Sequence, residues 1–278
     1  QGLQPNRLPD LLGRRLPVAK AQGEVFFSSD LETPAATPRT YRFRQPFGLP
    51  VRYHDIKVFS KVSNLDLVEI HLSYKDLEVD LDQVLPERQE IGLVVHAPEL
   101  FAGDHTLDLC TADEGYRDHS VRELQRVIDI SRDLRGRFRC PAPVLLVTNV
   151  GGFSEHRHLD RDERKPLQQR LIESLGRLNC GGDVEIIPQT MPPFPWHFGG
   201  QRFHNLFVDP GFIHSFCEQQ GMRVCLDVSH SKLACNHLHL PFRDFLNRIL
   251  PFTAHLHLAD ARDVDGEGLQ IQDGEIDW

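Results

Sequence analysis

Two stretches of the chain end a short apolar run with an acid and a histidine spaced three residues apart. In the first, Asp227 follows Val-Cys-Leu and precedes His230; in the second, His257 closes the run and precedes Asp260. Short apolar runs of this kind predict buried parallel strands, whose carboxyl ends meet on one side of a sheet. Asp and His side chains brought together there are ligands for hard-to-borderline divalent ions. The paired pattern therefore predicts a metal site, although each residue alone is as well explained as a strand-end cap.

Composition narrows the classes of protein to which the chain can belong. Its 278 residues suit one α/β barrel, and no apolar run approaches the ~18 residues of a membrane span, so we expect a soluble protein without a membrane partner. Six cysteines without a close pair indicate reduced, cytosolic thiols rather than a disulfide framework. The net charge of −9 disfavours sequence-independent binding to the phosphate backbone of nucleic acids, so no nucleic-acid partner is expected.

Strand and helix patterns alternate from about residue 47 onward. Strands are predicted at 50–55, 67–72, 91–96, 143–149, 184–188, 223–230 and 254–260. Helices are predicted around 56–62, 120–134, 167–178, 209–221 and 242–250, the second of them with Ser120 as its N-cap. Seven strand-then-helix units predict a (β/α)8 TIM barrel whose eighth unit lies beyond Trp278, unless the barrel closes in another way. An open doubly wound sheet is the alternative, but no Gly-x-Gly-x-x-Gly follows the first strand.

The first 40 residues differ from the rest of the chain. They are rich in proline, contain one β-like piece at 24–27, and end in a linker-like segment at 32–38. We therefore expect a small β-rich appendage and linker at 1–40, followed by the barrel domain at 41–278.

Polar side chains collect at the predicted strand ends, where barrels of this kind perform their chemistry. They are His54, Glu69, His71, His96, Asn149, Gln189, Asp227, His230, His257 and Asp260. This is more than helix capping requires. For His54, His71 and His255, however, a hydrogen-bonded barrel histidine is the simpler interpretation.

The loop at 191–205 alternates aromatic residues with proline and glycine. Such a stiff segment could cover the strand ends, with Trp196 and Phe198 stacking on a sugar face and Arg202 meeting an anionic group. A structural loop that plugs the barrel mouth explains the same composition.

Several of these motifs resemble one family. His96-Ala97-Pro98-Glu99-Leu100, Leu226-Asp227-Val228-Ser229-His230, His257-Leu258-Ala259-Asp260 and Gly266-Glu267-Gly268 look like the xylose-isomerase-like barrels of sugar isomerases, sugar epimerases and endonuclease IV. The resemblance covers about residues 47–278. It implies that Asp227 and His257 are metal ligands, that His230 is a ligand or its partner, and that His96 lies near the substrate or a second metal.

The chain also departs from that family. Gln189 stands where the family usually has a metal-binding glutamate, Asn149 stands where the endonuclease branch has a histidine, and the glutamate of strand eight is absent. A glutamine offers a neutral carbonyl to a hard cation but cannot take a proton. We therefore expect weakened ion binding, or a site completed beyond Trp278.

A second resemblance concerns the first 40 residues. Residues 13–21 and 23–31 look like the antifreeze-like (SAF-type) domain at the end of sialic acid (N-acetylneuraminate) synthases. Together with the barrel, they resemble the C-terminal half of long proteins of that type. This resemblance implies a synthase domain in the same longer chain and a part in nonulosonic acid or surface polysaccharide biosynthesis.

The expected function is metal-assisted isomerisation or epimerisation of an amino sugar, a sugar phosphate or a related polyol, with Mn, Zn, Co or Mg as the ion. The expected catalytic residues are Glu69, His96 and Glu267; the expected substrate contacts are His54, His71, Asn149, Trp196, Arg202 and Asp260; the expected metal ligands are Gln189, Asp227, His230 and His257. Two alternatives stay open: a degenerate sugar-binding or structural barrel, and an endonuclease IV-like hydrolase, which the charge disfavours. A homo-oligomer is expected.

Overall fold

The computed structural model describes residues 2–3, 7–14, 16, 18–31, 40–197 and 200–278, without the side chains of residues 60–62 and 196–197. The chain forms two compact units. One comprises Gln1–Arg44 with Lys57–Asn64, and the other comprises Gln45–Ile56 with Leu65–Trp278. Among the described residues, no helix is both long and apolar enough to cross a membrane.

The first unit holds little regular structure. It contains α1 (Leu8–Leu11), the 3-10 turn η2 (Ser28–Asp30) and most of α2 (Ile56–Val62). The β-like piece at 24–27 forms no strand in the described structure; its chain instead enters η2, where the Asp30 carboxylate accepts a hydrogen bond from the Phe27 amide at 2.8 Å. The predicted linker at 32–38 lies outside the described residues.

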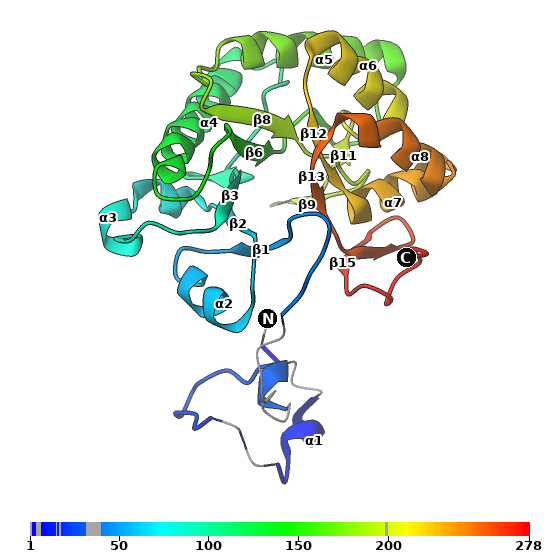
Figure 1. Cartoon of the computed structure of the whole chain (residues 1–278). Coiled ribbons are helices and arrows are strands. Elements are labelled where there is room, and N and C mark those ends of the chain that lie inside the picture. Colours follow the sequence, from blue (N-terminus) through cyan, green and yellow to red (C-terminus); the bar gives the residue numbers. More distant parts are fainter. Residues whose placement is uncertain (1, 4–6, 15, 17, 32–39, 198–199) are drawn as a thin grey trace. The chain divides into compact units, whose positions relative to one another are not determined.

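Parallel strands form the centre of the second unit (Figure 1). The strands β1 (Gly48–Val51), β2 (Leu67–His71), β3 (Gly92–His96), β6 (Val144–Thr148) and β8 (Val184–Pro188) pair in this order, and β12 (Val224–Asp227) pairs with β13 (Thr253–His257). A single parallel bridge between Gln189 and Cys225 joins the two groups. The seven predicted strands thus lie in chain order, which confirms the α/β TIM-barrel class; the described residues contain no eighth parallel strand.

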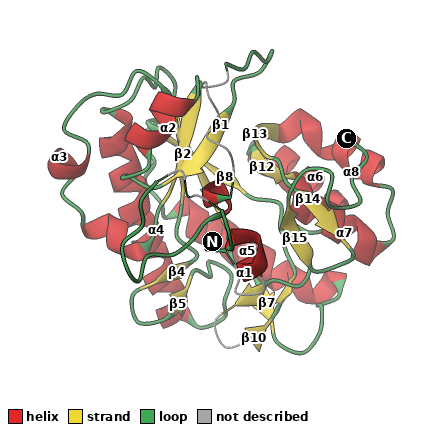
Figure 2. Cartoon of the chain, turned by 90° about the horizontal axis from the view of Figure 1, so that it is seen from below, coloured by secondary structure: helices red, strands yellow, loops and turns green. Residues whose placement is uncertain are grey.

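The strand sequences explain why this arrangement forms. Consecutive strands are rich in valine, leucine and isoleucine, and Val94, Val147, Ile187 and Cys225 pack into one buried cluster. Strands buried on both faces are apolar along their whole length, so their polar groups are displaced to the ends. In the view of Figure 2, α4 lies beside the five-stranded group, and α6, α7 and α8 lie beside β12 and β13.

The principal helices are α4 (Glu114–Arg135), α5 (Arg161–Gly176), α6 (Pro210–Gln220), α7 (Val228–Leu238) and α8 (Phe242–Ile249). Helix α6 begins as predicted, with Asp209 as the cap and Pro210 at its first position. Helix α4 differs from the prediction because Asp113, whose carboxylate accepts from the Tyr116 amide at 3.0 Å, is the cap. Ser120 is instead buried inside α4, where its hydroxyl contacts His105 Nε2 at 2.9 Å.

Short elements fill the connections. They are η3 (Tyr74–Glu78), α3 (Leu81–Val84), β4 (Leu100–Phe101), β5 (His105–Thr106), β7 (Phe153–Ser154), β9 (Trp196–His197), β10 (Gly200–Gln201), β11 (Phe203–His204), η4 (Leu250–Phe252), β14 (Asp260–Arg262) and β15 (Gly266–Leu269). Strand β11 pairs with β7, and β9 pairs with β10, so the predicted lid at 191–205 consists of short antiparallel pairs.

Candidate metal centre

Asp227 lies where β12 ends and α7 begins. One oxygen of its carboxylate accepts the His230 amide at 2.9 Å and caps the helix. The other oxygen, Oδ2, lies 3.0 Å from Gln189 Nε2 and 3.4 Å from His257 Nδ1. Although burial acts to raise the pKa of Asp227, the charge of His230 and the hydrogen bond from His257 outweigh it and lower the pKa to about 2. The carboxylate is therefore ionised at neutral pH.

Glu69 contacts three histidines, which lie on β2 and β13, two strands that do not pair with each other. It is 4% exposed, and its carboxylate oxygens lie 2.5 Å from His71 Nε2, 2.6 Å from His255 Nε2 and 2.8 Å from His257 Nε2. Alternation along β2 and β13 turns Glu69 and His71, and likewise His255 and His257, to the same side. Burial would raise the pKa of Glu69, but the three hydrogen bonds from histidine outweigh it and lower the pKa.

The His257 ring lies between these two carboxylates. Its Nε2 faces Glu69, and its Nδ1 faces Asp227 Oδ2 and, at 3.2 Å, Gln189 Nε2. Burial acts to lower its pKa, but the neighbouring Cys225, Asp227 and Glu69 outweigh it and raise the pKa well above the ordinary value. His257 thus joins the strand ends of β12 and β8 to the buried Glu69.

His230 contacts the same group from α7. Its Nδ1 lies 3.0 Å from the Thr190 carbonyl oxygen, so this nitrogen carries the hydrogen and donates. Its Nε2 lies 3.6 Å from the half-exposed Glu267 carboxylate on β15. While the bond to Thr190 is made, Nδ1 has no lone pair for an ion. This geometry fits His230 as a partner of the site better than as a ligand.

A sequence model of the xylose isomerase-like TIM barrel family matches residues 60–278. The chain belongs to this family. Among curated protein sequences, none matches the chain.

Three solved structures of similar fold are described as sugar epimerases or as epimerase-like. A D-tagatose 3-epimerase-like protein superposes with a TM-score of 0.58 at 19% identity, covering 84% of this chain and 83% of the other. A D-psicose 3-epimerase, in the presence of D-fructose, gives a TM-score of 0.53 at 12% identity over 77% and 73% of the two chains. The 3-keto-D-glucoside 4-epimerase of E. coli, in its apo form, gives 0.52 at 11% identity over 77% and 78%. At these identities the likeness establishes the fold.

The hydrogen bonds of His96 and Gln189 bear on whether the strand ends suit a metal ion. His96 Nδ1 donates to the Ala97 carbonyl at 2.8 Å, and burial lowers the pKa of His96 to about 4, so its Nε2 is a bare acceptor. That acceptor faces Gln189 Oε1, also an acceptor, at 3.2 Å. In this orientation of the Gln189 amide, the pair makes no hydrogen bond.

Half a turn of the Gln189 amide resolves the mismatch. Its nitrogen then donates to His96 Nε2, and its oxygen lies beside Asp227 Oδ2 and His257 Nδ1. His257 Nε2 donates to Glu69, as a metal-bound histidine usually donates to an outer carboxylate. Without an ion, the hydrogen on His257 Nδ1 faces the Asp227 carboxylate. Once that proton leaves, the oxygens of Gln189 and Asp227 and the Nδ1 of His257 offer three lone pairs that suit a divalent ion. The donor set of Gln189, Asp227 and His257, called the Asp227 position below, therefore fits the ion.

The remaining predicted residues lie outside this group. His54 sits exposed in the turn after β1, with Asp55 at 3.4 Å. The Asn149 side chain accepts from the Gly151 amide at 2.9 Å and shapes its own turn. Arg202 lies over the Phe153 ring. The side chain of Trp196 lies outside the described residues.

Asp260 is buried, and its contacts are structural. Its carboxylate accepts from the amides of Ala261, Gln272 and Ile276 and from the Trp278 indole at 2.8 to 3.1 Å. These four bonds hold the C-terminal hairpin and leave the carboxylate little capacity for a sugar. A role in substrate binding stays a prediction.

His255 is a hydrogen-bonded histidine, as its sequence context indicates, but its partner is the buried Glu69, 2.6 Å from His255 Nε2. The available signal was its spacing of two from His257, which places both rings on one side of β13. That Glu69 would meet this side could not be read locally, because β2 and β13 lie in different sheets.

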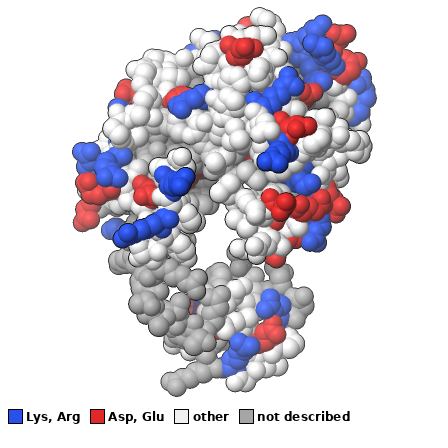
Figure 3. Space-filling view, turned by 45° about the vertical axis from the view of Figure 1, so that its right-hand side comes forward, with Lys and Arg blue, Asp and Glu red and all other residues white. Residues whose placement is uncertain are grey.

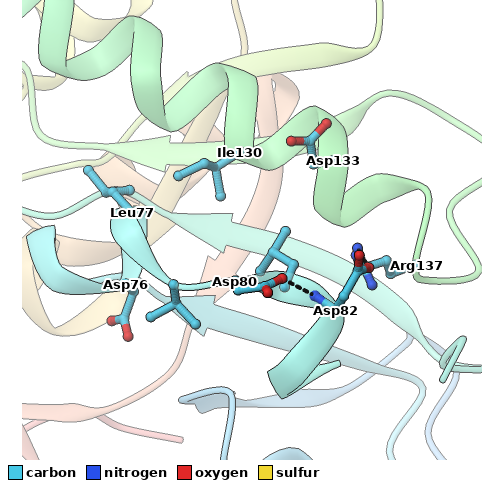
Figure 4. A pocket seen from close by; sticks show the side chains of 9 residues that line it. Asp76, Leu77, Asp80, Asp82, Ile130, Asp133 and Arg137 are labelled. Carbon is cyan, nitrogen blue, oxygen red and sulfur yellow. Dashed lines mark hydrogen bonds and ion pairs between the residues drawn. The ribbon is translucent and has the colours of Figure 1, made fainter. Parts of the chain in front are cut away.

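A cavity of about 440 Å³ lies elsewhere in the unit (Figure 4). Its lining residues are Asp76, Leu77, Val79, Asp80, Leu81, Asp82, Ile130, Asp133 and Arg137. None of them is among the residues described above around Glu69 and Asp227. Arg137 lies 2.5 Å from Asp82, so part of the acidic charge of the cavity is balanced by its own lining.

Proposed function

We propose that the barrel is a metal-assisted sugar isomerase or epimerase that acts on a sugar with a carbonyl next to a hydroxyl-bearing carbon. The observation that carries the proposal is the convergence of Gln189, Asp227 and His257 at the strand ends. The half-exposed Glu267 carboxylate lies 3.6 Å from the neighbouring His230. Membership of the family and the epimerase neighbours support the same class of reaction.

A divalent ion bound at the Asp227 position would polarise the carbonyl oxygen and the neighbouring hydroxyl oxygen of the sugar, and so acidify the hydrogen on the hydroxyl-bearing carbon. Asp227 supplies the anionic ligand, and Gln189 supplies a neutral oxygen whose orientation His96 holds. His257 supplies Nδ1, fixed by the bond from its Nε2 to Glu69.

Glu267 is assigned the proton transfer, and Glu69 is assigned positioning. The Glu267 side chain is 53% exposed and lies next to His230, so it can meet a substrate at the strand ends. Glu69 is buried, and three imidazoles already occupy its oxygens. A base must reach the hydrogen that it abstracts, which favours Glu267.

Proton abstraction is tested by solvent exchange. The chain, loaded in turn with Mn²⁺, Co²⁺, Zn²⁺ or Mg²⁺, is incubated in D₂O with a panel of ketoses and keto-glycosides, and deuterium uptake next to the carbonyl is followed by NMR. We expect uptake that falls at least about 100-fold in Glu267→Gln, with His214→Gln, on α6, as the matched control that keeps it. If no sugar in the panel exchanges with any ion, the enzyme proposal fails.

A sugar-binding barrel without chemistry is the second candidate. It is favoured by Gln189, because an amide at this position cannot take a proton. Sugar binding by calorimetry without deuterium uptake would select it. A repair hydrolase is disfavoured by the charge of −9 and by the interspersed basic and acidic side chains on the face shown in Figure 3.

The wider setting belongs to the same proposal. The synthase domain in a longer chain, the link to nonulosonic acid biosynthesis and the cytoplasmic location rest on the resemblance at residues 13–31 and on the cysteine content. Homo-oligomerisation is proposed as well, and the mass of the particle in solution tests it.

A further inference from the structure

The opposite edge of the His257 ring faces a second set of metal-ligand side chains. Glu69, His255 and His257 each place one ligand atom within 4.8 Å of the others. We propose that these three residues form a separate position for a transition-metal ion of the zinc class. It is called the Glu69 position below.

The chemistry of the donors indicates the class of ion. Two imidazole nitrogens and one carboxylate are a set that binds zinc with a fourth place open for water or another ligand. Imidazole favours Zn²⁺, Co²⁺ and Ni²⁺, whereas carboxylate and carbonyl oxygens favour Mg²⁺ and Mn²⁺. The Asp227 position has two oxygens and one nitrogen, so the two positions prefer different ions.

The scaffold holds the three donors in place. His255 and His257 project from one side of β13, and Glu69 comes from the middle of β2, so all three lie on strands rather than loops. His71 contacts the other oxygen of Glu69 and orients the carboxylate. The side chains of His255 and His257 are 16% and 19% exposed, which leaves a path for an ion to enter.

His257 makes the two positions mutually exclusive. A neutral imidazole has one lone pair: when Nδ1 serves the Asp227 position, Nε2 carries the hydrogen and donates to Glu69. When Nε2 binds an ion at the Glu69 position, Nδ1 carries the hydrogen and faces Asp227 Oδ2 at 3.4 Å. Each chain should therefore hold one ion, placed according to its class.

The experiment uses ion binding alone, without sugar. The chelator-treated chain is titrated with Zn²⁺ and with Mn²⁺ by calorimetry, and with Co²⁺ by visible absorption. His255→Gln removes a donor of the Glu69 position alone. Asp227→Asn removes the anionic donor of the Asp227 position, keeps an N-cap residue, and leaves an amide oxygen that can still accept the hydrogen on His257 Nδ1. His214→Gln, on α6, is the control. We expect His255→Gln to weaken Zn²⁺ at least about 100-fold, because the loss of even an outer-shell partner costs 10–100-fold. Mn²⁺ should bind nearly as before, and Asp227→Asn should show the reverse.

Two results overturn the proposal: Zn²⁺ affinity unchanged in His255→Gln, or Zn²⁺ affinity lost in Asp227→Asn as completely as that of Mn²⁺. If circular dichroism shows His255→Gln to be unfolded, Asp227→Asn decides alone, since retained Zn²⁺ supports the Glu69 position and lost Zn²⁺ refutes it. A chain that binds Zn²⁺ as expected but exchanges no sugar hydrogen contradicts only the proposed function.

Discussion

The two edges of the His257 ring differ in how the chain builds them. In the Asp227 position, Asp227 and His257 are the last residues of β12 and β13, and Gln189 directly follows β8. The order of the strands alone therefore brings these three residues together. The Glu69 position takes residues from within β2 and β13, and it depends on the contact of two strands that share no ladder. The first set lies at the strand ends where sugars are handled in barrels, and the second is a buried charge network. Local spacing therefore predicts the first, and only the closed fold reveals the second.

Removing the buried carboxylate should have the largest effect on stability. Glu69→Gln leaves histidines whose hydrogen bonds go to a neutral, partly mismatched amide, so we expect the free energy of unfolding to fall by about 3 kcal/mol. Urea unfolding at pH 7.5 without metal measures it. Glu267→Gln, at the exposed end of the other position, should change it by no more than about 0.5 kcal/mol. If both variants lost the same free energy of unfolding, Glu69 would be no more important to the stability of the fold than the exposed Glu267.

A histidine outside both positions sets the baseline for pH dependence. His105 is 7% exposed, and burial together with His119 lowers its pKa to about 4. Because the folded pKa lies below the unfolded value, stability is unaffected above pH ~6.5 and falls as pH drops toward 4, by about 2 kcal/mol at pH 5. His105→Gln should flatten this slope between pH 7 and 5, whatever its offset at pH 7. If the free energy of unfolding of His105→Gln fell with pH as steeply as that of the wild type, protonation of His105 would not be the cause of the fall.

Local sequence signals predict most of the strands and helices, and the wrong predictions also have local causes. Apolar runs predicted all seven strands: β2, β3, β6, β8 and β12 are largely buried, and the more exposed β1 and β13 still have apolar residues in their sequences. Helix α4 starts earlier than predicted since both Asp113 and Ser120 are good caps, and the stretch between them has few apolar residues to reveal its periodicity. Helix α7 was not predicted, because Asp227-Val228-Ser229-His230 was interpreted only as a strand end.

The site could be predicted in part. The meeting of Gln189, Asp227 and His257 follows from parallel strands in chain order. The group around Glu69 does not, since its contacts join residues about 190 positions apart in two separate sheets. The part played by Asp260 was hidden because its four partners come from the hairpin that follows it, and backbone amides leave no mark in the sequence.

Restoring an acid at the end of β8 gives the smallest effect and the sharpest test of the Asp227 position. In Gln189→Glu the new carboxylate faces Asp227 Oδ2 and His257 Nδ1 in place of an amide. A hard cation gains more from an anionic oxygen, so Mn²⁺ should bind on the order of tenfold tighter, about 1.4 kcal/mol. Without metal, the added charge beside Asp227 and the lost donor to His96 should lower stability by about 1 kcal/mol. Zn²⁺ at the Glu69 position should respond little, since Gln189 is not among its donors. Calorimetry with both ions decides: unchanged or weaker Mn²⁺ binding would mean that the end of β8 does not face the ion, and the ligand roles of Gln189 and Asp227 would fall together.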